Sequence, residues 1–254
     1  TRLVDDPEKA DVILLCIGET RKMSGENASR STLQLHGIEL VEQYAAYGKP
    51  IVLVVSSGRP VSLEKPEPLV DAILHIWQPG VRGSVALARL LTGQANPSGK
   101  LAMTFPRHVG QLPMYYNMHY RARPGRMGAY QDVAMSPMYP FGHGLSYTRF
   151  TYENLSVDAG TLEARVTVSN TGKRAGTEAV LWFISDPEAS LTQPIKKLKH
   201  FEKIELQPGE SVELAFNIDP ERDLSYPGFD GRQILEPGTF ILQAGDLSAP
   251  FVLD

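Results

Sequence analysis

The chain has 254 residues, of which 42% are hydrophobic and 21% are charged, a composition typical of globular proteins and a length that allows two domains. Its formal net charge is −4, and its Lys and Arg residues are scattered, which argues against nucleic acid as a partner. No apolar run approaches the roughly 20 residues of a membrane-spanning helix, so we predict no membrane segment.

The first part of the chain, residues 1–106, alternates continuous apolar runs with amphipathic stretches. This pattern is typical of buried parallel strands separated by helices. The runs predicted as strands are Val12–Ile17, Ile51–Val55, Ala72–Trp77 and Leu101–Phe105. Helical spacing is found at Leu35, Ile38, Val41 and Ala45, and again at Val85, Ala88 and Leu91. We therefore predict an α/β domain over residues 1–106.

The middle of the chain, residues 107–147, is rich in Tyr, Met, Gly, Pro and Arg and shows no sustained period. We predict a long connector that lies over the surface. Irregular segments of this length are uncommon in compact domains and are often functional.

After residue 147 the hydrophobic period changes to two. Apolar residues alternate with polar ones at Leu162, Ala164, Val166 and Val168, and at Val212, Leu214, Phe216 and Ile218. This alternation is typical of strands with one buried face. Turn sequences occur at 170–172, 208–209 and 237–238. We predict that residues 148–254 form an all-β sandwich of the immunoglobulin or fibronectin type III kind.

The cysteine and histidine content argues against a metal site. The single cysteine, Cys16, lies in the apolar run Val12–Ile17, and we expect its thiol to be buried. One cysteine excludes an internal disulfide and a cysteine-based metal cluster. The six histidines lack the spacing that places two ligands on one helical face. We predict neither a metal ion nor another cofactor.

The first predicted strand leads into a loop, residues 18–30, that is rich in charged side chains. Two carboxylates, Glu19 and Glu26, lie in it with Arg21, Lys22 and Arg30. In open α/β sheets, ligands bind at the loops that follow the C-terminal ends of the strands. This loop is therefore the candidate site.

The loop resembles that of bacterial periplasmic β-glucosidases of glycoside hydrolase family 3. In that group a Gly-Glu pair closes the strand, as Gly18 and Glu19 do here, and a second Glu precedes a Ser-Arg pair, as Glu26 precedes Ser29 and Arg30. The blocks that also match, in the family's order, are Lys49–Val54, Ser57–Pro60, Ala72–Leu74, Trp77–Gly80, Asn96–Leu101, Thr104–Pro106, Gly110–Tyr116 and Tyr139–Tyr147. Together these collinear blocks are very specific.

The resemblance implies a fold and a mechanism. Family members have a barrel, then an α/β sandwich domain, then usually a fibronectin-like domain; this sequence shows no barrel and only part of the α/β domain. The family's nucleophilic Asp belongs to the barrel, so no residue here is assigned that role. The resemblance also implies a retaining mechanism with a covalent glycosyl-enzyme intermediate. Glu26 would act as the general acid/base, with Ser29, Arg30 and Glu19 in support.

Two assignments within the loop stay open. Glu19 is the rival of Glu26, because family members differ in which loop carboxylate acts. Its place directly after the strand suggests instead a residue that braces the loop. Arg30 either pairs with a loop carboxylate or holds the surface between domains.

The resemblance implies an exo-acting β-glucosidase, located in the periplasm or secreted. Because the chain opens close to an apolar strand, we expect any export signal to lie upstream of Thr1. The implied partners are a β-glucoside oligosaccharide and the barrel domain of the same enzyme, and a homodimer is left open. The alternatives are a β-xylosidase or exoglucanase of the family, or a non-catalytic carbohydrate-binding or scaffold fragment, which would not need the Glu26 loop.

Overall fold

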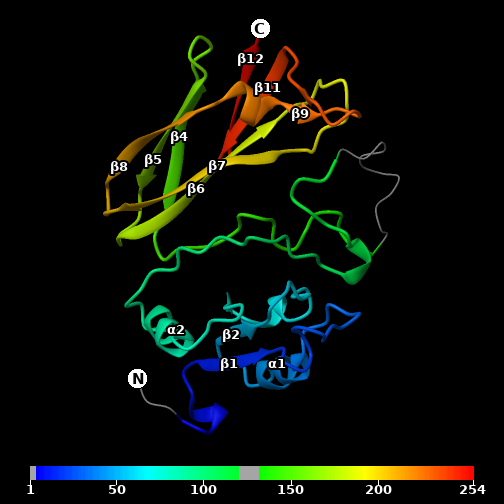
Figure 1. Cartoon of the computed structure of the whole chain (residues 1–254). Helices are drawn as coiled ribbons and strands as arrows, with labels where there is room; N and C mark the ends of the chain where they lie inside the picture. Colours follow the sequence, from blue (N-terminus) through cyan, green and yellow to red (C-terminus); the bar gives the residue numbers. More distant parts are fainter. Residues whose placement is uncertain (1–3, 120–131) are drawn as a thin grey trace. The chain divides into compact units, whose positions relative to one another are not determined.

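The computed structural model describes residues 4–119 and 132–254, which form two compact units (Figure 1). Of the described residues, the first unit contains 4–92, 103–114 and 132–140, and the second contains 93–102, 115–119 and 141–254. The chain passes between the units more than once in the predicted connector. The domain boundaries after residues 106 and 147 therefore stay predictions.

The first unit is an α/β unit with a three-stranded parallel sheet. Its strands are β1 (Ile13–Gly18), β2 (Ile51–Ser56) and β3 (Ala72–His75), and its helices are α1 (Ile38–Ala45) and α2 (Gly83–Leu91). Short 3-10 helices span Pro7–Lys9, Glu67–Leu69 and Val109–Gln111. The strands are hydrogen-bonded in the order β1-β2-β3. The α/β class predicted from the apolar runs is confirmed.

Burial explains why β2 is the central strand. Its residues Ile51, Leu53, Val54 and Val55 are at most 2% exposed, and branched aliphatic side chains favour a strand that is covered on both faces. Helix α1 begins after Gly37, whose φ of +84° is readily adopted by glycine. Among residues 4–119 and 132–254, no helix is long and apolar enough to cross a membrane.

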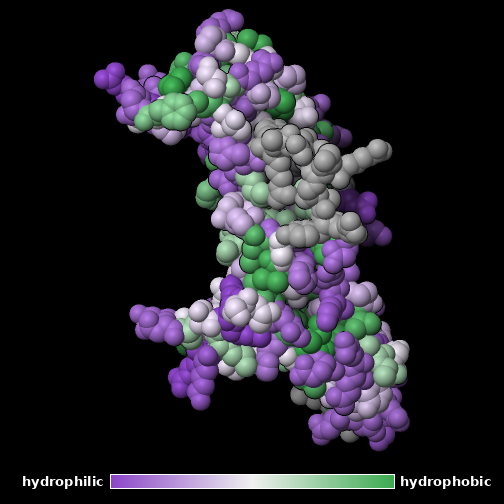
Figure 2. All heavy atoms as spheres, turned by 90° about the vertical axis from the view of Figure 1, so that its right-hand side faces the viewer, coloured by the Kyte–Doolittle hydropathy of each residue, from purple (hydrophilic) through white to green (hydrophobic). Residues whose placement is uncertain are grey.

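Strand β1 is buried on one face only. Ile13 and Leu15 are buried, whereas Leu14 and Cys16, which alternate with them, are exposed. The expectation that Cys16 is buried is therefore wrong, because it assumed that β1 is covered on both faces as β2 is. Figure 2 shows hydrophobic residues among hydrophilic ones on the visible surface of this unit, in the lower part of the picture.

The run Leu101–Phe105 is not a strand. The amide of Leu101 donates to the carbonyl of His143 at 2.8 Å, in the second unit, and the amide of Phe105 donates to the carbonyl of Tyr139 at 2.9 Å, in the first. Only an isolated antiparallel bridge joins Phe105 and Tyr139. The strand prediction is wrong here because a short apolar run does not distinguish a ladder from an extended segment that pairs at single positions.

The second unit is a β-sandwich of two antiparallel sheets. The larger sheet contains, in order, β12 (Leu247–Leu253), β11 (Gly238–Ala244), β6 (Gly176–Ser185) and β7 (Lys197–Leu206). The smaller contains β4 (Phe150–Val157), β5 (Glu163–Asn170) and β8 (Ser211–Asn217). A separate pair consists of β9 (Tyr226–Pro227) and β10 (Gln233–Ile234), which follow a π-helical turn at Pro220–Leu224.

The core of this unit lies between the two sheets. Alternate residues of β5, namely Ala164, Val166 and Val168, are fully buried, as are Trp182 of β6 and Leu242 of β11. Because side chains of a strand point alternately to opposite faces, the period of two places one apolar row in this core. The sandwich predicted from that period is confirmed.

Candidate active-site loop

The three strands of the parallel sheet end at one edge. The register pairs Gly18 with Ser56 and Val55 with His75, so the loops after β1, β2 and β3 begin side by side. Gly18 has a φ of +153°, and a Cβ atom there would lie 1.9 Å from the carbonyl oxygen of Ser56. Only glycine allows this approach. Gly18 therefore determines where the loop 18–30 leaves the sheet.

Glu19 is a buried carboxylate at the base of this loop, with a side chain that is 1% exposed. Arg59, in the loop after β2, donates from Nη2 to Oε1 of Glu19 at 2.7 Å and from Nε to Oε2 at 3.2 Å. The hydroxyl of Ser57 donates to Oε2 at 2.9 Å, and Nη1 of Arg30 donates to Oε1 at 3.2 Å. One buried carboxylate is thus bound by two guanidinium groups and a hydroxyl.

These partners keep Glu19 ionised. Burial by itself would raise the pKa of Glu19, because it disfavours the charged form. The hydrogen bonds from Arg59, Ser57 and Arg30 and the charge of Arg59 outweigh burial and hold the pKa below its ordinary value. Glu19 therefore has no proton to donate near neutral pH, which suits an ion-paired anchor and not a general acid.

Glu26 lies in a tight turn at the other end of the loop. Gly25 and Ala28 exchange two backbone hydrogen bonds, each 3.1 Å long, which leaves Glu26 and Asn27 at the centre of the turn. Asn27 has a φ of +58°, a left-handed conformation that asparagine tolerates better than most residues. Glu26 is exposed. The loop thus carries one buried, ion-paired carboxylate and one exposed carboxylate.

Of the four predicted site residues, the structure joins Glu19 and Arg30, whereas Glu26 and Ser29 are exposed. Arg30 pairs with Glu19, the first of its two predicted alternatives, and also donates to the carbonyl of Gln34 at 3.3 Å. Ser29 is exposed, and its side chain has no hydrogen bond to the part of the chain that the structure describes.

Sequence reasoning missed the roles of Ser57 and Arg59. Both lie in the Ser-Gly-Arg-Pro turn directly after β2, and Arg59 is 40 residues from Glu19. The signal was nevertheless present, because β1 and β2 were both predicted as parallel strands, and the C-terminal ends of adjacent parallel strands meet at one edge.

A domain match identifies the family. The "Glycosyl hydrolase family 3 C-terminal domain" matches residues 1–147, more than half of the chain. The chain belongs to glycoside hydrolase family 3. A "Fibronectin type III-like domain" matches residues 178–248, within the sandwich unit.

Curated relatives include a β-glucosidase and a β-xylosidase. The chain is similar to "Periplasmic beta-glucosidase" of Salmonella typhimurium, with 40% identity over 261 residues that cover 97% of the chain and 34% of the relative. "Beta-xylosidase" of Formosa agariphila is 37% identical over 246 residues, covering 94% of the chain and 34% of the relative. The chain thus spans about a third of the length of these relatives.

Solved β-glucosidase structures share the fold. The β-glucosidase from Listeria innocua in complex with glucose superposes with a TM-score of 0.91 at 33% identity, covering 96% of this chain and 37% of that one. The β-glucosidase EmGH1 from Erythrobacter marinus superposes with a TM-score of 0.88 at 37% identity, covering 97% of this chain and 35% of that one. Both units of the chain therefore have counterparts in these two β-glucosidases.

His75 ends β3 at the same edge of the sheet. Its ring packs edge-on against Trp77 and Phe105, with centroid distances of 4.4 Å and 5.0 Å. Both ring nitrogens are buried, and neither has a hydrogen-bond partner among residues 4–119 and 132–254. Burial lowers the pKa of His75 to about 4, so the ring is neutral near pH 7. In this family 3 chain His75 is a packing residue.

We expect the first unit to lose stability as the pH falls from 6.5 to about 4, because over that range the unfolded chain protonates His75 and the folded chain does not. Above this range His75 is neutral in both states, and below it His75 is protonated in both. At about 1.4 kcal/mol per pH unit, the loss amounts to about 3 kcal/mol. Thermal unfolding of His75→Phe should lack this slope, while His36→Phe, at an exposed histidine, should keep it. Parallel slopes in wild type and His75→Phe would contradict the prediction.

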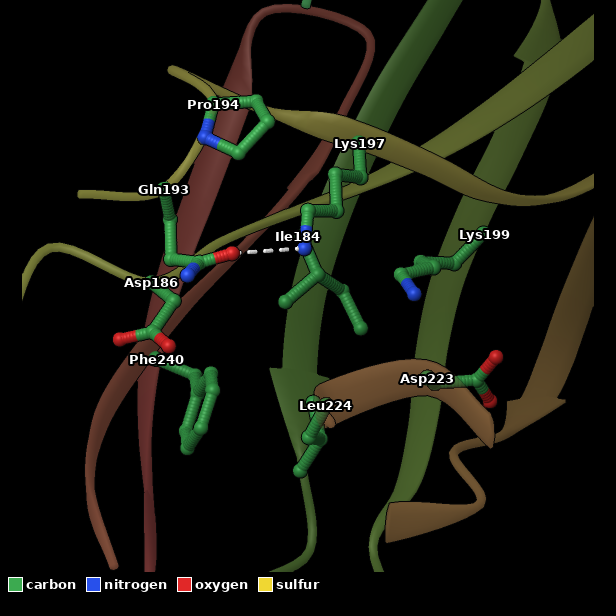
Figure 3. Close-up of a pocket in the computed structure, with 9 residues that line it drawn as sticks. All are labelled: Ile184, Asp186, Gln193, Pro194, Lys197, Lys199, Asp223, Leu224 and Phe240. Atoms are coloured by element: carbon green, nitrogen blue, oxygen red, sulfur yellow. Dashed lines mark hydrogen bonds between the residues drawn. The ribbon is translucent and has the colours of Figure 1, made fainter. Parts of the chain in front are cut away.

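A small pocket lies in the sandwich unit. It is lined by Ile184, Asp186, Gln193, Pro194, Lys197, Lys199, Asp223, Leu224 and Phe240 (Figure 3). Nζ of Lys197 donates to Oε1 of Gln193 at 2.9 Å, and Asp223 pairs with Arg222 at 2.6 Å. Burial lowers the pKa of Lys197 and of Lys199. These polar groups are bound by their neighbours, and no predicted site residue lines the pocket, so the loop 18–30 remains the candidate site.

Within residues 4–119 and 132–254, no group of three or more His, Cys, Asp and Glu side chains is placed to hold a metal ion.

Proposed function

We propose that the chain is the C-terminal part of a retaining, exo-acting β-glucosidase and that Glu26 is its general acid/base. The supporting observation is the contrast between the two carboxylates of the loop. Glu19 is buried between Arg59 and Arg30, while Glu26 is exposed in a turn. A carboxylate whose two oxygens are bound by guanidinium groups and a hydroxyl has none free for a sugar, whereas the exposed Glu26 carboxylate can exchange a proton with substrate. Glu19 then supports the loop instead of acting on substrate.

In the proposed reaction the second carboxylate comes from a barrel domain. Retaining glycosidases hold two carboxyl groups about 5–5.5 Å apart; one attacks the anomeric carbon and the other protonates the departing oxygen. Glu26 would donate that proton in the first step. In the second step it would take a proton from the water that hydrolyses the glycosyl-enzyme intermediate. Ser29 and Arg30 would support the loop in both steps.

The proposed substrate is the terminal β-D-glucosyl residue of an oligosaccharide. The relative from Salmonella typhimurium is named a periplasmic β-glucosidase, which supports this substrate and a periplasmic or secreted location. β-Xylosidase is the second candidate, because the relative from Formosa agariphila has that name and a similar identity. An exoglucanase and a non-catalytic carbohydrate-binding fragment are further alternatives with less support, and a homodimer stays open.

The test uses a polypeptide in which this chain follows a family 3 barrel domain, here termed the barrel-containing enzyme. Proton NMR during hydrolysis of an aryl β-glucoside should show β-glucose as the first product, because double displacement retains the anomeric configuration. The kcat/KM for the aryl β-glucoside should exceed that for the xyloside by about tenfold or more, since the missing hydroxymethyl group removes contacts. Initial release of the α-anomer would contradict the retaining mechanism, and a preference for the xyloside would favour the second candidate.

A further inference from the structure

One carboxylate holds both ends of the loop. Glu19 precedes residues 20–29, and Arg30 follows them and returns to Oε1 of Glu19 at 3.2 Å. Nη2 of Arg59 lies 2.7 Å from the same oxygen. Glu19 and Arg30, which flank this segment, therefore meet at one buried atom, Oε1 of Glu19.

Arg59 extends this anchor to the chain beyond the loop. Besides its paired bonds to Glu19, it donates from Nη2 to the carbonyl of Thr32 at 2.8 Å and from Nη1 to the carbonyl of Arg30 at 3.4 Å. A planar guanidinium that binds a carboxylate through two nitrogens fixes direction as well as distance. The residues on both sides of the loop are thus held by the turn after β2.

The turn that contains Glu26 depends on the contacts that hold the two ends of the loop. Between the anchors, Met23 and Ser24 donate their amides to the carbonyl of Thr20 at 2.9 Å and 3.2 Å, and Gly25 pairs with Ala28. All these bonds lie within the loop itself. The direction in which the turn leaves the sheet is therefore set where the loop is held, at Glu19.

We propose that Glu19, Arg30 and Arg59 are positioning residues for Glu26. They act by holding the two ends of the loop, so that the Glu26 carboxylate is presented in one place. This inference rests on the proposed role of Glu26. A displacement of about 1 Å at a reacting group can cost about a hundredfold in rate, so loss of the anchor should slow the reaction although none of the three residues touches the sugar.

The test is a double-mutant cycle in the barrel-containing enzyme, with an aryl β-glucoside that has a poor leaving group. We expect Glu19→Gln to lower kcat by about 10- to 100-fold when Glu26 is present. In a Glu26→Gln background the same change should lower kcat by no more than about twofold, because the group that it positions no longer transfers a proton. Glu42→Gln, at an exposed glutamate of α1 outside the loop, is the matched control and should have no effect.

The cycle separates this inference from the proposed function. If Glu26→Gln is as active as wild type, the proposed function is wrong. If Glu26→Gln is slow and Glu19→Gln slows it again by the full factor, only the positioning inference is wrong, because Glu19 then acts independently of Glu26.

A folding defect is checked by circular dichroism and by a milder variant. Glu19→Gln leaves the charge of Arg59, which is 24% exposed, without its ionic partner. If that variant unfolds, Arg30→Gln takes its place in the cycle, because it removes one contact with Glu19 and keeps the Arg59 pair. A loss with Arg30→Gln that disappears in the Glu26→Gln background supports the inference. Wild-type kcat, or an equal loss in both backgrounds, overturns it.

Discussion

Hydrolysis of aryl β-glucosides by the 254-residue chain alone should be undetectable, while the barrel-containing enzyme is active under the same conditions. Double displacement requires two carboxyl groups on opposite sides of the anomeric centre. The loop offers one, since Glu19 is buried between Arg59 and Arg30. The other belongs to the barrel in the proposed assignment.

The measurement is release of the aryl group at high concentrations of the purified chain. Its control is the same chain with Glu26→Gln, because trace activity from a contaminating glycosidase would be equal in both preparations. Turnover that is present with Glu26 and absent with Gln would contradict the prediction and place both catalytic groups within this chain.

Glu26→Gln should reduce hydrolysis by the barrel-containing enzyme by about 10²- to 10⁴-fold for substrates with poor leaving groups. Only these substrates need a proton on the departing oxygen. An activated aryl glycoside should still form the covalent intermediate, whose breakdown then becomes limiting because Gln cannot activate water. Azide should restore turnover, since it attacks the intermediate without a base.

The leaving-group series is measured for wild type, Glu26→Gln and Glu19→Gln, with Glu42→Gln, at an exposed residue of α1, as the control for the chemical change. The proposed assignment is wrong if Glu19→Gln shows the leaving-group dependence and the azide rescue while Glu26→Gln stays near wild type. The general acid/base would then be Glu19.

Periodicity was sufficient to predict the elements that carry the fold. The continuous apolar runs predicted β1, β2 and β3, and the alternation at Ala164, Val166 and Val168 predicted a strand with one face in the sandwich core. These signals are local, because the spacing of apolar residues along a strand is read from that strand's own sequence. The loop 18–30 was predicted as the site because it follows the C-terminal end of a strand.

Features that depend on non-local contacts were not predicted. Cys16 is exposed because no described element covers the outer face of β1, which the strand's own residues do not encode. The depressed pKa of Glu19 depends on Arg59, which sheet register brings close across 40 residues of chain. The pKa of His75 likewise depends on burial, and Phe105, which is distant in sequence, packs against its ring.

The closed base of the loop has a consequence for engineering. Glu19 and Arg30 meet at one oxygen atom, so the two ends of the segment 20–29 are joined by side chains that lie outside that segment. We expect that a segment of another length or composition can be exchanged between these two points while the ion pairs of Glu19 are kept. The cost of closing a longer segment grows only slowly with its length. We therefore expect grafted loops that keep Glu19, Arg30 and Arg59 to retain this ion-paired anchor.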